Sequence, residues 1–293
     1  ACVLILLYFG SIFGNSGMTC FVVALESLMF FLQVGCGNVA DVLGRMLRYR
    51  RKRGLYTNVC IVRRRLVLLL SVLGVVCFGL MFGLADVLAD KLFQIPTAGL
   101  IIKILSPVIL IRMATSILQG HFQSFGSHVQ TTISYLLRPI LYLLIGKGMC
   151  NKTMVYGEKV ADLLRNEDFH GMYGVVGLAV AVGIAELIAF AVMLLFYFIS
   201  DRNNDKKKSK EGLQKKETAV ETLVMFGRLS GPHIGIGLLA HLLVIAVLFL
   251  LEDKAPLGIY YGTFLMVCAL PVLLIATRFY LLYAKTIYAI KGQ

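Results

Sequence analysis

The chain has 293 residues, a mean hydropathy of +0.82 and 58% hydrophobic residues. Soluble domains contain about 45–50% apolar residues, so this composition excludes an ordinary soluble protein. Long apolar runs recur without the alternation of a membrane β-barrel, which predicts an all-α integral membrane protein. The net charge of +13 does not indicate nucleic-acid binding, because the basic runs lack interleaved stacking aromatics.

Apolar segments recur along the whole chain. A bilayer core of about 30 Å requires about 20 apolar residues in a helix. We expect about eight transmembrane helices, at about residues 1–13, 18–43, 66–88, 99–118, 131–145, 173–199, 223–251 and 259–283. The first segment is too short to span. Because the chain starts inside an apolar run without Met, we expect its true N-terminus to be missing.

The hairpin at 99–145 is the most informative stretch. Two apolar segments flank a short polar hinge at 119–128, which predicts two helices that turn on small residues. Lys103, Arg112 and Arg138 lie in or beside its apolar part. Charged side chains at that depth are costly and usually face a protein interior or an aqueous cavity.

Basic residues divide the linkers into two classes. The stretches 45–65 and 201–217 hold nine and seven Lys or Arg residues, whereas the alternate linkers together hold six. The positive-inside rule therefore places both basic stretches, and the 119–128 hinge with them, on the cytoplasmic side of a multi-pass protein of the cell membrane. The same charges attract anionic headgroups, so membrane lipids are expected partners.

Short motifs in the hairpin resemble a known transporter family. The fourth-helix signature of the MOP exporter superfamily is L-x-P, a spacer and L-R-G-Y-F-Q-G, and the chain has Leu105-Ser106-Pro107 and then Ile117-Leu118-Gln119-Gly120-His121-Phe122-Gln123. The similarity is greatest to the polysaccharide and lipid-linked saccharide flippases, the MurJ-like and SpoVB-like branches. The chain departs from the signature at three positions, with Gln119 for Arg, His121 for Tyr and Ser124 for Gly.

Further similarities imply a domain organisation. The stretch from Gly171 to Glu186 is similar to the family's sixth helix, and Ala269-Leu270-Pro271 to its eighth. Members have two six-helix lobes. The resemblance therefore implies an N-terminal lobe at 1–200, a basic cytoplasmic linker at 201–217 and the first two helices of a second lobe at 218–293, in a partial chain.

Ionisable residues inside the apolar segments are the candidate site. The sequence has no motif for catalysis, a metal or a cofactor, so we do not expect an enzyme. The deep cations are Arg112, Arg138 and Arg278, and the deep acids are Glu26 and Glu186. Either Arg112 forms a structural ion pair with Glu26 or Glu186, or these residues line a cavity for a phosphate-bearing substrate. Arginine suits phosphate because its planar fork stays charged when desolvated.

Two histidines, His233 and His241, lie eight residues apart in the seventh segment, which is about two helical turns along one face. Histidine titrates near physiological pH, so both are candidates for proton coupling. Packed or interfacial histidines are the alternative interpretation.

Three functions remain open from the sequence. The excess of deep cations and the flippase-like motifs favour a transporter that flips an undecaprenyl-pyrophosphate-linked saccharide across the cytoplasmic membrane by alternating access, coupled to H⁺ or Na⁺. A MATE-type cation-coupled multidrug antiporter would instead use the acids to bind cations. A partial membrane protein that transports nothing is the third hypothesis.

The predicted orientation can be tested by labelling single cysteines in a cysteine-free background. We expect a cysteine at Ser209 to be protected from an impermeant thiol reagent in intact cells and a cysteine at Asn166 to react. The readout is the mass shift of the labelled protein. Reaction at Ser209 with protection at Asn166 would reverse the orientation.

Overall fold

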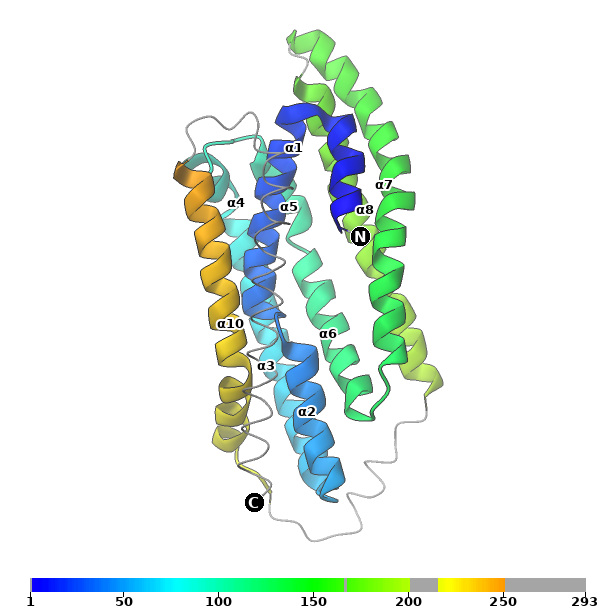
Figure 1. Cartoon of the computed structure of the whole chain (residues 1–293), viewed down its shortest axis with the longest axis vertical. Helices are drawn as coiled ribbons and strands as arrows, with labels where there is room; N and C mark the ends of the chain where they lie inside the picture. The colour runs from blue at the N-terminus through cyan, green and yellow to red at the C-terminus, as the bar shows by residue number, and fades with distance from the viewer. Residues whose placement is uncertain (1, 166–167, 201–215, 251–293) are drawn as a thin grey trace.

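The computed structural model describes residues 2–165, 168–200 and 216–250, and these form a bundle of long helices (Figure 1). Within these residues six helices are long and apolar enough to cross a membrane, which confirms the prediction of an all-α membrane protein. The expected eighth segment, at 259–283, lies outside the described residues, and so does Arg278.

Helix α1 (Cys2–Gly35) is two helical pieces joined at Gly14, whose φ of 67° lies in the left-handed region that glycine tolerates. The first piece packs on α7 and α8, beside which it lies in Figure 1. Phe13 is buried there, and a Cβ on Gly174 would lie only 2.8 Å from its ring. The first apolar segment therefore folds back onto the bundle, and the first spanning helix begins at Ser16.

The basic stretch at 45–65, which the sequence predicted to be a linker, forms a helical hairpin. Helix α2 (Val39–Lys52) and helix α3 (Tyr56–Gly83) are separated by three residues, in which Gly54 has a φ of 71°. Arginine and lysine are good helix formers, so a basic run extends a helix beyond the apolar segment instead of ending it.

After α3 the chain forms the short helix α4 (Ala85–Val87) and the π-helix η1 (Leu88–Leu92). Helix α5 (Ala98–Leu105) and helix α6 (Val108–Ser124) meet at Pro107, which has no N–H to continue the helix. The polar hinge predicted at 119–128 is wrong in its first half, because α6 continues through Ser124. A Cβ on Gly120 would lie 2.8 Å from the Ala40 carbonyl oxygen, so glycine lets α6 approach α2 closely.

Helices α7 (Val129–Leu164) and α8 (Asp168–Ile199) form the most extensive helix pair in the described structure. Together they include residues 147–164 and 168–172, which lie between the fifth and sixth predicted segments. Glycines allow the close approach, since a Cβ on Gly157 would lie 2.8 Å from Tyr173 Cβ. Small residues at such contacts let the backbones of membrane helices pack tightly.

Helix α10 (Ala219–Leu250) lies at the edge of the bundle along α1, α2 and α3 (Figure 1). Only 6% of its most apolar window is buried. Helix α10 is therefore peripheral in the described structure. The division into two lobes remains a prediction, because the part of the chain that would form the second lobe is not described beyond Leu250.

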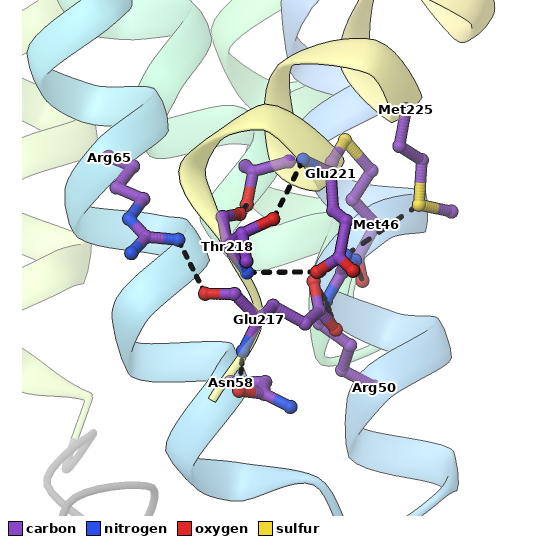
Figure 2. A network of polar contacts seen from close by, with 9 residues as sticks. Met46, Arg50, Asn58, Arg65, Glu217, Thr218, Glu221 and Met225 are labelled. Atoms are coloured by element: carbon purple, nitrogen blue, oxygen red, sulfur yellow. Dashed lines mark hydrogen bonds and ion pairs between the residues drawn. The ribbon is translucent and has the colours of Figure 1, made fainter. Parts of the chain in front are cut away.

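A polar network fastens the start of α10 to the α2–α3 hairpin (Figure 2). Arg50 donates from Nε and Nη2 to the Glu217 carboxylate, at 2.9 and 2.5 Å, and from Nη1 to the Met46 carbonyl at 2.8 Å. The backbone of Glu217 is held by α3, because its N–H donates to Asn58 and its carbonyl accepts from Arg65. Hydrogen bonds therefore hold both the side chain and the backbone of Glu217 in place.

The next residues start the helix with a reciprocal cap. The Thr218 N–H donates to the Glu221 carboxylate at 2.8 Å, and the Glu221 N–H donates to the Thr218 hydroxyl at 3.2 Å. This capping box satisfies two backbone donors that a helix start would otherwise leave unpaired. The beginning of α10 is therefore determined locally as well as by its contact with Arg50.

Replacing Glu217 with Ala should destabilise the protein by roughly 3 kcal/mol, because the Arg50 side chain, only 3% exposed, would lose its counter-charge. The estimate lies at the low end for buried pairs because the Glu217 side chain is 23% exposed. Thermal unfolding in detergent measures the change.

The matched control is the partly buried pair Arg45–Asp41 on α2, whose side chains are 23% and 39% exposed and whose nitrogen and oxygen lie 2.6 Å apart. Breaking it with Asp41→Ala should cost less than about 1 kcal/mol. Equal melting temperatures for the Glu217 and Asp41 variants would contradict the role assigned to the Arg50–Glu217 pair.

Candidate functional site

The most strongly buried ionisable group in the bundle is Glu186 of α8, whose side chain is 0% exposed. Arg112 of α6 places Nε 3.0 Å from Oε1, and Arg138 of α7 donates from Nε to Oε2 at 3.1 Å. The Tyr142 hydroxyl donates to Oε1. One carboxylate thus joins three helices, and each of its oxygens faces a guanidinium group.

The cluster carries more positive than negative charge, because two guanidinium groups share one carboxylate. Arg138 is 3% exposed, and its Nη1 is buried and has no hydrogen-bond partner among the described residues. The Arg112 side chain remains 26% exposed. The cluster is therefore buried at Glu186, where both carboxylate oxygens have partners, and partly exposed at the positively charged Arg112.

Local sequence explains how the two arginines reach Glu186. Arg112 lies in the second turn of α6, just after the interruption at Pro107. Arg138 immediately precedes Pro139, which removes one backbone hydrogen bond inside α7. The Arg138 guanidinium also lies 5.4 Å from the centre of the Tyr135 ring, within the range of a cation–π contact.

A polar stripe runs along the same face of α7. Thr131, Ser134 and Arg138 follow one another at helical spacing and are all buried. Within the part of the chain that the structure describes, the Thr131 and Ser134 hydroxyl oxygens, like Arg138 Nη1, have no hydrogen-bond partner. Buried polar groups are normally satisfied, so these donors are available to a polar ligand or to water.

A second titratable cluster joins α1 to α10. His241 Nδ1 lies 2.6 Å from Oε1 of Glu26, whose side chain is 4% exposed. His233 lies two turns earlier on α10. The side-chain amide of Gln33, from α1, donates to the His233 carbonyl at 3.0 Å and lies 3.4 Å from His233 Nδ1. The two histidines therefore share the face of α10 that contacts α1, as their spacing predicted.

The structure divides the predicted site residues between two places. Arg112, Arg138 and Glu186 come together among α6, α7 and α8, and Glu26 pairs with His241 elsewhere in the bundle. Arg112 forms an ion pair with Glu186, one of the two partners considered for it in the sequence.

Sequence reasoning missed two polar partners, Tyr142 and Gln33. Tyr142 lies one helical turn after Arg138, a spacing that could have identified it as a residue of the same face. Gln33 carried no comparable signal. Among the described residues, no group of three His, Cys, Asp or Glu side chains could hold a metal ion.

Comparison of the chain with protein-family models, with curated proteins and with solved structures finds no match. The motifs in α5 and α6 therefore remain a resemblance to MOP exporters, without support from these comparisons.

The Glu186 cluster should behave as one energetic unit. Glu186→Gln removes the negative charge that two guanidinium groups share. Arg138→Gln leaves the Glu186 carboxylate with one guanidinium partner, Arg112. Each should destabilise the protein by about 3–5 kcal/mol. The loss of unfolding free energy in the double variant should be smaller, by about 1–3 kcal/mol, than the sum of the losses in the two single variants. Thermal unfolding in detergent measures all three variants.

The control cycle uses Lys103 and Asp86, which form a 2.7 Å pair but have 35% and 65% exposed side chains. Lys103→Gln and Asp86→Asn should each cost less than about 1 kcal/mol and should be additive within about 0.5 kcal/mol. Additive losses at Glu186 and Arg138 as well would show that these two residues are not coupled.

Proposed function

We propose that the protein is a membrane transporter that moves an anionic, lipid-linked saccharide across the cytoplasmic membrane, with an undecaprenyl-pyrophosphate carrier as the lipid. The observation that supports it is the cationic cluster at Glu186, where two membrane-embedded arginines share one acid and Arg112 remains partly exposed. The protein acts without chemical catalysis, by alternating access.

Charge and geometry both favour a phosphate group at Arg112. A guanidinium inside a membrane is costly unless it has an anionic partner, and the Glu186 cluster keeps one positive charge in excess. Arginine donates to phosphate through a planar fork, and such charge-assisted hydrogen bonds are short and strong. Arg112 uses its Nε toward Glu186, while a quarter of the side chain remains exposed for another anion.

The resemblance to MOP-type flippases adds a second arginine to this proposal. In the two-lobe architecture that the resemblance implies, Arg278 belongs to the opposite lobe, and a pyrophosphate would bridge Arg112 and Arg278. Arg138 then acts behind Arg112 and adds positive charge to the same site. Coupling to H⁺ or Na⁺ would drive the cycle.

A cation-coupled multidrug antiporter is the second candidate, and one observation favours it. Glu26 is a nearly buried acid inside a spanning helix, and its carboxylate lies 2.6 Å from the imidazole Nδ1 of His241. Acids at that depth can bind a proton or Na⁺ in exchange for a cationic drug. The two candidates predict opposite substrate charge.

Arg112→Ala should weaken binding of a lipid pyrophosphate by about ten- to a hundredfold, because one charge-assisted contact contributes roughly 1.5–3 kcal/mol. Arg112→Lys should restore only part of the affinity, since lysine lacks the planar fork. Binding of undecaprenyl pyrophosphate to the purified protein in detergent provides the measurement.

The control is Arg228→Ala, which removes an exposed arginine on α10 and should leave the affinity unchanged. Unchanged affinity in a folded Arg112→Ala protein would remove Arg112 from the site. Binding of a lipophilic cation in place of the lipid pyrophosphate would favour the antiporter.

A further inference from the structure

Arg138 has a hydrogen-bond donor that its ion pair does not use. Its Nε donates to Glu186 Oε2 at 3.1 Å, whereas its Nη1 is buried and finds no acceptor among the described residues. An N–H group of a charged side chain is costly to bury when no acceptor satisfies it. A buried acceptor placed beside Nη1 would therefore bind strongly.

Ser134 lies one helical turn before Arg138, on the same face of α7, and is fully buried. Side chains in a helix lean toward its N-terminus, so Arg138 covers the turn that contains Ser134. The position of the guanidinium group agrees with this, because its Cζ lies 5.4 Å from the ring centre of Tyr135 in the same turn. The Ser134 hydroxyl also has no hydrogen-bond partner in the part of the chain that the structure describes. Two unpaired buried donors thus lie near each other on α7.

The Ser134 hydroxyl differs from other buried serine hydroxyls in the bundle. Ser27 and Ser230 each donate to the carbonyl four residues earlier, at 2.9 and 2.7 Å. That carbonyl is the usual acceptor for a hydroxyl inside a helix. Ser134 has the equivalent carbonyl at Gln130, within α7, but makes no such bond. Its hydroxyl is therefore available to an acceptor outside its own helix.

The charge of the Glu186 cluster favours an anion as that acceptor. Among the described residues, the charged groups that act electrostatically on Arg138 are Arg112, which repels it, and Glu186, which attracts it. Two guanidinium groups and one carboxylate leave one positive charge in excess inside the membrane, where an uncompensated charge is costly. A monovalent anion would neutralise it. A single-atom anion suits a buried position, because it accepts hydrogen bonds from any direction and has no further oxygens that need donors.

We propose that Arg138 Nη1 and the Ser134 hydroxyl bind a chloride ion inside the bundle. The ion accepts a hydrogen bond from each donor and brings the net charge of the cluster to zero. This site is separate from the one proposed at Arg112, since the Arg138 side chain is 4% exposed and the Arg112 side chain is 26% exposed. A phosphate at Arg112 would repel the ion. That consequence rests on the proposed function, but the chloride site itself does not.

The test is a chloride titration of the purified full chain in detergent, followed by thermal unfolding with circular dichroism. Sodium chloride replaces sodium gluconate at constant ionic strength. A ligand that binds only the folded protein raises the unfolding temperature in proportion to the occupancy of its site. We expect chloride to raise the unfolding temperature with a single-site dependence on its concentration, and bromide to act in the same way. No lipid substrate is added, so the result is independent of the transport proposal.

Ser134→Ala removes one donor to the ion and should weaken the apparent chloride affinity by about ten- to a hundredfold. In gluconate this variant should be as stable as the parent, because the hydroxyl that it removes bonds to no described residue. The control is Ser230→Ala, since Ser230 is similarly buried but its hydroxyl already donates to its own helix. This control should keep the parent's chloride affinity. Equal unfolding temperatures in chloride and gluconate, or equal chloride affinities in the two variants, would overturn the proposal.

Discussion

A carboxylate buried between two guanidinium groups constrains the arrangement of α6, α7 and α8. Glu186 is inaccessible to solvent, and an ionised acid at that depth is tolerated only while its partners stay in place. Arg112 and Arg138 come from two different helices and approach different oxygens of the carboxylate. A shift of either helix by one turn would separate charges that cannot be rehydrated inside a membrane. The register of these three helices therefore depends on this cluster.

The two sides of the bundle are stabilised by different physics. Helices α7 and α8 approach closely where glycines remove side chains from the contact, which gives extensive van der Waals packing. Helix α10 buries little apolar surface and is held by polar contacts to α1, α2 and α3. Close backbone packing therefore dominates the contact of α7 with α8, whereas hydrogen bonds and ion pairs are prominent in the contacts of α10.

Apolar content predicted the helical class and most spanning segments, but it misplaced several boundaries. The stretches at 45–65 and 119–128 were interpreted as a linker and a hinge because they are charged or polar, and each is largely helical. Charge marks where the bilayer ends, and it does not mark where a helix ends. Lys, Arg, Glu and Gln are good helix formers, so α7 continues for 36 residues, longer than a bilayer requires.

The sequence by itself determined the helical membrane class and the small set of deep ionisable residues, because both follow from composition along the chain. Only the tertiary structure decided which charges meet. In the sequence, Glu26 and Glu186 were equivalent candidate partners for Arg112. In the folded protein Arg112 pairs with Glu186, and His241 contacts Glu26. Spanning helices are apolar on nearly every face, so their periodicity does not reveal which side faces a neighbour. The order and rotation of the packed helices supply that information.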